Sequence, residues 1–206
     1  MYSKRSGLIL GFHGCDRALR DRIVSERGVV LNPSENKWDW LGNGAYFWEN
    51  NQERALLFAQ ELKENPPKGK ENLIDEPAVL GAILDLGYCL DLLDSEYLKV
   101  IKKAFDFLLE SEKKYGKKIP KNIVNIKGEL LCRNLDCAVI EATHQLNNKL
   151  GSKYDSVRGV FFEGEDLYED AGFKEKNHIQ IAIRNPNCIK GYFIPRELDP
   201  KHSILK

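Results

Sequence analysis

The stretch GLILGFHGCDRALRDRIVSERGVVLNPSENKWDWLGNGAYFWENNQERALLFA, residues 7–59, decides the fold. Its first apolar run, Gly7–Phe12, is bounded by polar residues and predicts a buried strand. That strand is expected to end in His13 and Gly14, a polar side chain followed by a bare backbone. The strand end therefore offers both an imidazole and an accessible peptide group.

Each half of this stretch continues into a predicted helix. Asp16 is a candidate N-cap for a helix through Ile23. Further along, Leu41–Trp48 places two glycines ahead of a second, aromatic-rich strand, after which Asn50 or Asn51 caps another helix. One face of that helix carries apolar residues at helical spacing: Ala55, Phe58, Ala59 and Leu62.

The composition is that of a globular protein. A chain of 206 residues is long enough to bury a core, and we expect one domain over 1–206. Lys plus Arg and Asp plus Glu both number 31, so the formal net charge is zero. The overall charge therefore points to neither a nucleic-acid nor a membrane partner, although a local basic groove would not show in the sum.

The cysteines and the apolar runs bear on the cellular compartment. Five cysteines lie at scattered positions with no Cys-x-x-Cys pair, so neither zinc nor a disulfide framework is expected. Reduced, buried thiols predict a cytoplasmic protein. The apolar stretch near the N-terminus is too short for a signal peptide, and no run approaches a membrane span.

The middle of the chain predicts one strand and two helices. Pro77–Leu86 is an apolar run bounded by turn signals, typical of a central strand. Helical spacing extends over Glu96–Lys114 and again over Glu129–Leu150, with a basic loop between them. We expect these helices to form an insertion, about 94–150, that packs on one side of the sheet as scaffold or contacts a substrate or partner.

The last third predicts strands joined by an acidic, aromatic loop. Val157–Glu163 and His178–Arg184 are strand-like, and Gly164–Asn177 forms the loop between them. Cys188–Ile194 follows a turn and is expected to return as the second strand of a hairpin. The order of elements predicts an α+β fold.

The His-Gly pair at a strand end and the glycine-rich turn into a tyrosine, each with a helix behind it, resemble the ADP-ribosyltransferase superfamily. The branch is that of diphtheria toxin and poly(ADP-ribose) polymerase, with its His-Tyr-Glu signature. His13-Gly14 matches the first motif, and Leu41–Phe47 followed by Ala55 matches the second. The third motif is a late strand, a place that 177–183 fills. The resemblance implies a split β-sheet core with flanking helices and a helical insertion.

The resemblance also implies a set of NAD contacts. By analogy, His13 bonds a ribose hydroxyl, the Gly14 backbone holds the nicotinamide amide, and Tyr46 stacks on the nicotinamide ring. Arg54 reaches the diphosphate or is a solvated surface residue, and Phe58 replaces a second stacking tyrosine or leaves the ring covered on one side. The implied cofactor-binding set is His13, Gly14, Gly44, Tyr46, Arg54 and Phe58; the catalytic set is His13, Tyr46 and Gln180.

The third motif departs from the family. Gln180 stands where the family has Glu, so it supplies a hydrogen bond to ribose but no negative charge. This departure favours single transfer over polymer elongation. The loop acids either supply the missing charge, act as a general base or are solvated; they are Glu163, Glu165 and Glu169. His178 is a candidate for orienting acceptor or ribose, and Arg158 for binding phosphate.

The leading hypothesis is an NAD-dependent mono-ADP-ribosyltransferase that acts on a protein or nucleic acid. Small intracellular members of the superfamily are often toxins of toxin–antitoxin or anti-phage systems, which implies an antitoxin partner. One alternative is a catalytically inactive NAD or ADP-ribose reader. A second is an RNA 2′-phosphotransferase, which should carry more arginines for phosphate, and a third is a structural domain that binds no NAD.

Overall fold

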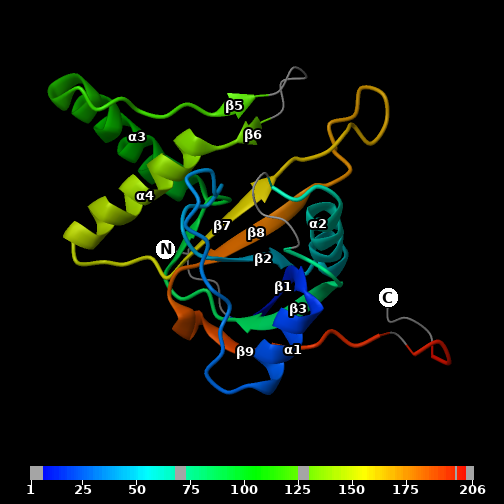
Figure 1. Cartoon of the computed structure of the whole chain (residues 1–206). Coiled ribbons are helices and arrows are strands. Elements are labelled where there is room, and N and C mark those ends of the chain that lie inside the picture. The colour runs from blue at the N-terminus through cyan, green and yellow to red at the C-terminus, as the bar shows by residue number, and fades with distance from the viewer. Residues whose placement is uncertain (1–6, 68–72, 125–129, 198, 203–206) are drawn as a thin grey trace.

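The chain folds as an α+β protein around one mixed sheet (Figure 1). The computed structural model describes residues 7–67, 73–124, 130–197 and 199–202. The seven strands of the sheet are, in spatial order, β4 (Cys89–Asp91), β7 (Ser156–Phe161), β8 (His178–Ile183), β2 (Ala45–Glu49), β1 (Ile9–Asp16), β3 (Pro77–Leu84) and β9 (Ile189–Phe193). Strands β4 and β7 run parallel, whereas the other neighbouring pairs are antiparallel.

Strand β1 is longer than the sequence predicts. It pairs with β3 without a break, from Ile9 opposite Leu84 to Asp16 opposite Pro77. Because β3 supplies backbone partners along this whole length, the strand continues beyond Phe12 instead of ending there. Both residues of the first motif therefore lie inside a strand.

The two predicted helix caps near the N-terminus are confirmed. Asp16 accepts a hydrogen bond from Ala18 N (2.8 Å) and caps α1 (Arg17–Ser25). Asn51, the second of the two candidates, accepts one from Arg54 N (2.9 Å) and caps α2 (Gln52–Glu64). Local sequence thus fixes where both helices begin.

Helix α2 packs directly on β1 at Gly14. Ala55 and Ala59 are fully buried there, and a Cβ placed on Gly14 would lie only 2.0 Å from the carbonyl oxygen of Ala55. A glycine on the strand and two alanines on the helix are what allow this close approach. Gly14 is therefore a packing residue of the fold as well as part of the first motif.

Helices α3 (Ser95–Tyr115) and α4 (Asn134–Lys149) pack against each other on one face of the sheet, as predicted (Figure 1). The prediction of a helix from Glu129 is wrong at its start. Leu130–Cys132 forms strand β6, which pairs with β5 (Ile123–Val124) as a separate ribbon. Part of the expected basic loop, residues 125–129, lies outside the described residues.

The predicted hairpin of the last two strands is also wrong. Strand β9 follows a short 3₁₀ turn, η1 (Pro186–Cys188), and then pairs with β3 at the other end of the sheet. Both edges of β8 are already occupied, one by β2 and the other by β7. The chain therefore crosses to an open edge that β3 offers.

The two faces of the sheet bury different side chains. Tyr46 and Trp48 point to the face covered by α2, α3 and α4, whereas Phe47 points to the face that carries α1. No helix in the described part of the chain is long and apolar enough to cross a membrane.

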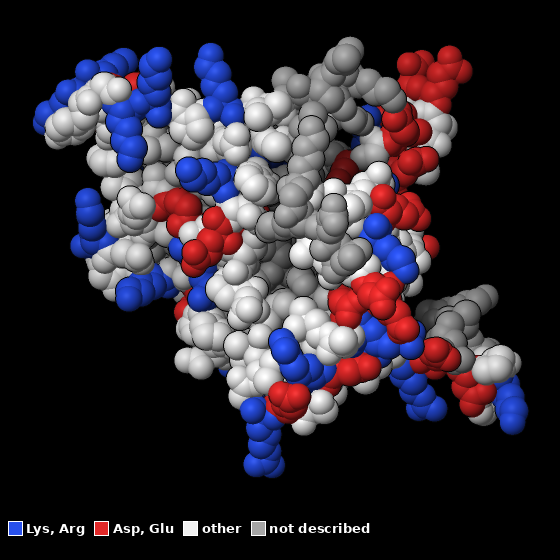
Figure 2. Space-filling model, viewed as in Figure 1, with Lys and Arg blue, Asp and Glu red and all other residues white. Residues whose placement is uncertain are grey.

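Charged side chains are unevenly spread over the surface in view. Figure 2 shows Lys and Arg gathered over α3 and the segment that follows it. Asp and Glu gather instead on the loop between β7 and β8. A neutral total thus conceals separate basic and acidic regions.

Replacing Asp16 with Ala should lower the free energy of unfolding by about 1 kcal/mol at pH 7. Besides capping α1, the carboxylate accepts hydrogen bonds from Asp75 N (2.8 Å) and Glu76 N (3.0 Å). These backbone donors, that of Glu76 foremost, lower the pKa of Asp16 below its ordinary 3.8. The contribution is therefore complete above that value and is lost as the pH falls through the lowered pKa.

Urea unfolding of the two proteins at pH 7 and pH 3 measures this effect. The difference between wild type and Asp16→Ala should shrink at pH 3, whereas Glu26→Ala, an exposed acid beyond α1, should change little at either pH. An Asp16→Ala protein as stable as wild type at pH 7 would contradict the assignment.

Candidate functional site

The candidate site lies where β1 and β2 part. The register between these strands pairs Gly11 with Glu49 and Phe12 with Trp48, and it extends no further. The next rung of an antiparallel ladder would join Gly14 to Tyr46. In its place, His13 Nδ1 lies 2.7 Å from the carbonyl oxygen of Tyr46. The imidazole therefore takes up the acceptor that the missing rung would have used.

The lost rung leaves the peptide group of Gly14 facing the gap. Asn50 N donates to Leu10 O across the same edge of β1 (3.0 Å). Peptide groups of alternate residues in a strand point to the same edge, so those of Phe12 and Gly14 also face β2. Phe12 still has its ladder partner, whereas the ladder stops before Gly14. A backbone donor and a backbone acceptor of Gly14 thus point toward β2 beside His13, beyond the last rung of the ladder.

The hydrogen bond fixes the chemical state of His13. A carbonyl oxygen only accepts, so Nδ1 carries the proton, and Nε2 is the acceptor of the neutral ring. Burial lowers the pKa of His13, and the bond to Tyr46 offsets only part of that effect. Nε2 bonds to none of the residues that the structure describes. A neutral imidazole with an available acceptor can receive a hydrogen bond from a ligand hydroxyl.

Tyr46 closes the glycine-rich turn that precedes it. Its hydroxyl donates to Gly42 O (2.7 Å) and accepts from Leu41 N (2.9 Å). Burial strongly raises the pKa of this phenol, so it remains protonated at physiological pH. The hydroxyl is thus committed to the turn, and what Tyr46 offers a ligand is its ring.

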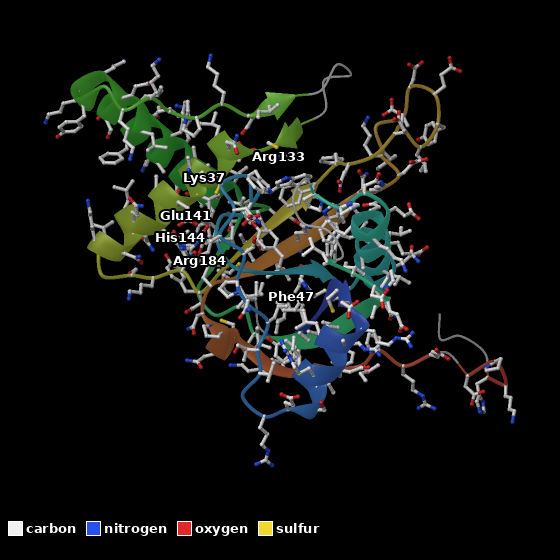
Figure 3. The ribbon with its side chains drawn as sticks, in the orientation of Figure 1. Lys37, Phe47, Arg133, Glu141, His144 and Arg184 are labelled. Atoms are coloured by element: carbon white, nitrogen blue, oxygen red, sulfur yellow. The ribbon has the colours of Figure 1, made fainter. Side chains whose placement is uncertain are left out.

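Helix α4 anchors the same turn from outside. Asn43 N donates to Glu141 Oε1 (2.8 Å), and Arg184 donates both to Asn43 O (2.9 Å) and to Glu141 (2.5 Å). Figure 3 shows Glu141 and Arg184 together beside His144. Gly42 has a φ of 74°, and a Cβ on it would lie 2.5 Å from Glu141 Oε1. The sequence gives no local signal for these anchors, because each is far from the turn along the chain.

The three predicted catalytic residues lie on neighbouring strands, β8, β2 and β1, though not on one face of the sheet. Tyr46 lies opposite Ala182, and Trp48 opposite Gln180, so Tyr46 and Gln180 point to the same face of the sheet. His13 alternates to the other face, where its ring lies 6.0 Å from that of Phe47, and it reaches Tyr46 only through the gap. Gln180 is half-buried.

Gly44 and Phe58 have packing roles in the structure. A Cβ on Gly44 would lie 2.9 Å from Ile183 O, so this glycine lets β2 enter the sheet beside β8. Phe58 packs on Trp48, with ring centroids 4.9 Å apart. Trp48 is itself 2% exposed, so the partly buried Phe58 ring covers a core side chain.

Arg54 is buried in an ion pair. Its side chain is 5% exposed, its Nη2 lies 2.9 Å from Glu163 Oε2, and its guanidinium lies 5.6 Å from the Trp48 ring centroid. The alternative of a solvated surface arginine therefore does not hold. Glu163 is the loop acid that the structure brings to this cluster, and its charge is matched by Arg54. Glu169 lies exposed in the same loop.

His178 adds a buried nitrogen to this cluster. Its Nδ1–H donates to Lys176 O (2.6 Å), and its buried Nε2 has no hydrogen-bond partner in the described part of the chain. Burial lowers its pKa, so the ring is neutral near pH 7. The ring lies 6.2 Å from that of Trp48 and 5.7 Å from that of Phe161.

Arg158 belongs to the opposite face. It is 2% exposed and pairs with Glu49 (2.5 Å) and Asp91 (3.2 Å), which joins β7 to β2 and β4. Arg158 therefore has a structural role, because its buried ion pairs connect three strands. Among the described residues, no group of three or more His, Cys, Asp or Glu is arranged to hold a metal ion.

Comparison with known proteins adds a relative without a known activity. No family model and no solved structure matches the chain. The chain is 24% identical over 197 residues to an uncharacterized protein of Methanocaldococcus jannaschii, MJ0359, in a match that covers 87% of this chain and 83% of the relative.

Replacing Gly14 with Ala should lower the free energy of unfolding by about 1–3 kcal/mol, because the new Cβ meets the Ala55 carbonyl. Gly191→Ala is the matched control: it is also a strand glycine, but a Cβ there meets nothing within 4 Å. Thermal or urea unfolding compares the two variants. Equal stabilities would contradict the close packing of α2 on β1.

Proposed function

We propose that the protein is an NAD-dependent mono-ADP-ribosyltransferase that moves ADP-ribose to a protein or nucleic acid. The observation that carries the proposal is the His13–Tyr46 hydrogen bond. It joins the two motifs that resemble the ADP-ribosyltransferase superfamily, and it orients an imidazole acceptor beside the Gly14 peptide group, at the point where the β1–β2 ladder stops.

These groups complement the two ends of nicotinamide riboside. A primary carboxamide has an acceptor oxygen and a donor NH2 group, which suit the Gly14 N–H and C=O respectively. A ribose hydroxyl can donate to His13 Nε2. The bond between ribose C1′ and the nicotinamide nitrogen then breaks, and its electron pair leaves with nicotinamide. The acceptor attacks the oxocarbenium-like C1′ and releases a proton.

The lack of a negative charge at the third motif position, Gln180, favours slow, single transfer. Gln180 supplies dipoles but no carboxylate, and the nearby Glu163 is paired with Arg54. Negative potential that would stabilise the cationic transition state is therefore weak, and electrostatic stabilisation is usually the largest catalytic contribution. An enzyme of this kind transfers one unit more readily than it builds a polymer.

The same observation supports a second candidate, an inactive reader of NAD or ADP-ribose. Such a protein would keep the groups that bind nicotinamide and ribose and lack the charge that drives cleavage. In the first candidate, a role as a toxin with a neutralising protein partner follows from the resemblance alone.

Label transfer tests the proposal. Purified protein is incubated with cell lysate and NAD labelled on the adenylate phosphate. Label should enter macromolecules with wild type, fall at least about tenfold with His13→Ala, and fall less with Gln180→Ala. His202→Ala is the matched control, because that histidine is 81% exposed and far along the chain.

The outcomes separate the candidates. Label that is lost with His13→Ala and kept with His202→Ala supports the transferase, and protease or nuclease sensitivity then gives the acceptor class. NAD binding without nicotinamide release supports the reader. An absence of NAD binding would overturn both.

NAD affinity should depend on pH through His13. Protonation of Nε2 removes the acceptor. Because the pKa of His13 is lowered from 6.5, the ring stays neutral and the NAD affinity should be constant between pH 8 and pH 6.5. It should weaken at lower pH, by about tenfold per unit once the ring titrates. Calorimetric titration with NAD at several pH values measures this loss of affinity at low pH, which His13→Gln should abolish. If the NAD affinity of His13→Gln still weakened at low pH, the assignment would be contradicted.

A further inference from the structure

A cavity of about 480 Å³ lies between α3, α4 and β7, away from the gap between β1 and β2. Its size is within the range of small-molecule sites. Its apolar walls come from all three elements and include Leu98, Ile101, Val139 and Val160. Charged and aromatic side chains complete it: Trp40, Lys102, Arg133, Asp136 and Phe161.

An aromatic pair and a guanidinium form one end of the cavity. The rings of Trp40 and Phe161 lie 4.6 Å apart. The Arg133 guanidinium carbon lies 4.1 Å from the Trp40 ring centroid and 5.2 Å from that of Phe161. Flat side chains of this kind are the surfaces on which proteins stack nucleobases.

Arg133 has hydrogen-bonding capacity that the fold does not use. Among the residues that the structure describes, its buried Nε has no hydrogen-bond partner, and its Nη1 makes a long contact with Asp136 (3.5 Å). A buried donor without a partner is costly, and it points to a group that the bound state supplies. An anion is the natural partner of a guanidinium.

Two cationic side chains and one carboxylate line the cavity. Lys102 and Arg133 line it against the single acid Asp136, and Lys102 is 65% exposed at the side chain. Lys102 also pairs with Asp106, outside the cavity lining. The basic region over α3 lies on the same side of the molecule, and the acidic β7–β8 loop lies apart from it (Figure 2).

We propose that this cavity binds a nucleoside monophosphate unit, with the base against its apolar walls beside Trp40 and Phe161 and the phosphate on Arg133. Such a unit combines a planar apolar group with an anion, as the lining requires. It occurs both in a nucleic-acid chain and in the adenylate half of NAD. The inference concerns binding alone and does not rest on the proposed transferase activity.

The position of the cavity suits a group beside the candidate site. Strand β7 is three strands from β1 in the sheet, which is about 14 Å at the usual spacing. A ligand in the cavity therefore lies near the gap without filling it.

Calorimetry with AMP, CMP, GMP and UMP tests the proposal, with nucleosides and inorganic phosphate as incomplete ligands. At least one monophosphate should bind, and more tightly than its nucleoside or phosphate alone. Arg133→Met should weaken binding at least about tenfold. Leu98→Trp, a change at a half-exposed residue of the lining, should block the cavity with little risk to the fold.

Matched variants control for stability and charge. Arg17→Met removes an exposed arginine, and Leu57→Trp adds the same bulk on α2, so both should bind as wild type does. His13→Ala should also keep nucleotide binding, which separates this site from the proposed NAD contacts. No binding of any monophosphate, or binding unchanged in both Arg133→Met and Leu98→Trp, would overturn the proposal.

Competition with NAD identifies the source of the unit. If NAD displaces the bound monophosphate from wild type, and Arg133→Met weakens NAD as well, the cavity holds the adenylate half of NAD. If both ligands bind together, it holds a nucleotide of a nucleic-acid chain. Either result supports a nucleoside monophosphate site.

Discussion

The hydrogen bond from His13 to the Tyr46 carbonyl is the interaction on which the candidate site depends. Strands β1 and β2 pair up to Phe12 and Trp48, and the imidazole then replaces the next rung. One bond thereby occupies the acceptor of the next rung, fixes the tautomer of His13 and leaves the Gly14 peptide group without its ladder partner on β2. Without it the two strands would pair onward, and the space in which we propose nicotinamide riboside to bind would be closed by backbone hydrogen bonds.

Elements distant in the sequence hold this arrangement in place. Helix α2 lies directly on Gly14, so any side chain there would displace it. The Glu141–Arg184 pair holds the turn before β2 through hydrogen bonds to the Asn43 backbone. Burial keeps both His13 and Tyr46 neutral, the first by lowering its pKa and the second by raising it. The helical insertion thus contributes directly to the candidate site through α4, in addition to covering the sheet.

Local chemistry made part of this structure predictable. The caps at Asp16 and Asn51 and the helical insertion follow from residues adjacent in the chain. The strand partner of β9 and the anchoring of the turn by Glu141 do not, because they depend on which sheet edges are open and on contacts about a hundred residues apart. Arg54 shows the same limit: its sequence position suits a surface residue, yet Glu163 and Trp48 enclose it.

Nitrogen NMR of the protein labelled with ¹⁵N tests the central claim most directly. In the absence of NAD, His13 should carry its proton on Nδ1, with Nε2 bare. Saturating NAD should then shift the His13 Nε2 and Gly14 amide resonances and leave the Gly191 amide, on the outer strand β9, unchanged. A His13 ring protonated on Nε2, or resonances of His13 and Gly14 that NAD leaves unmoved, would contradict the account.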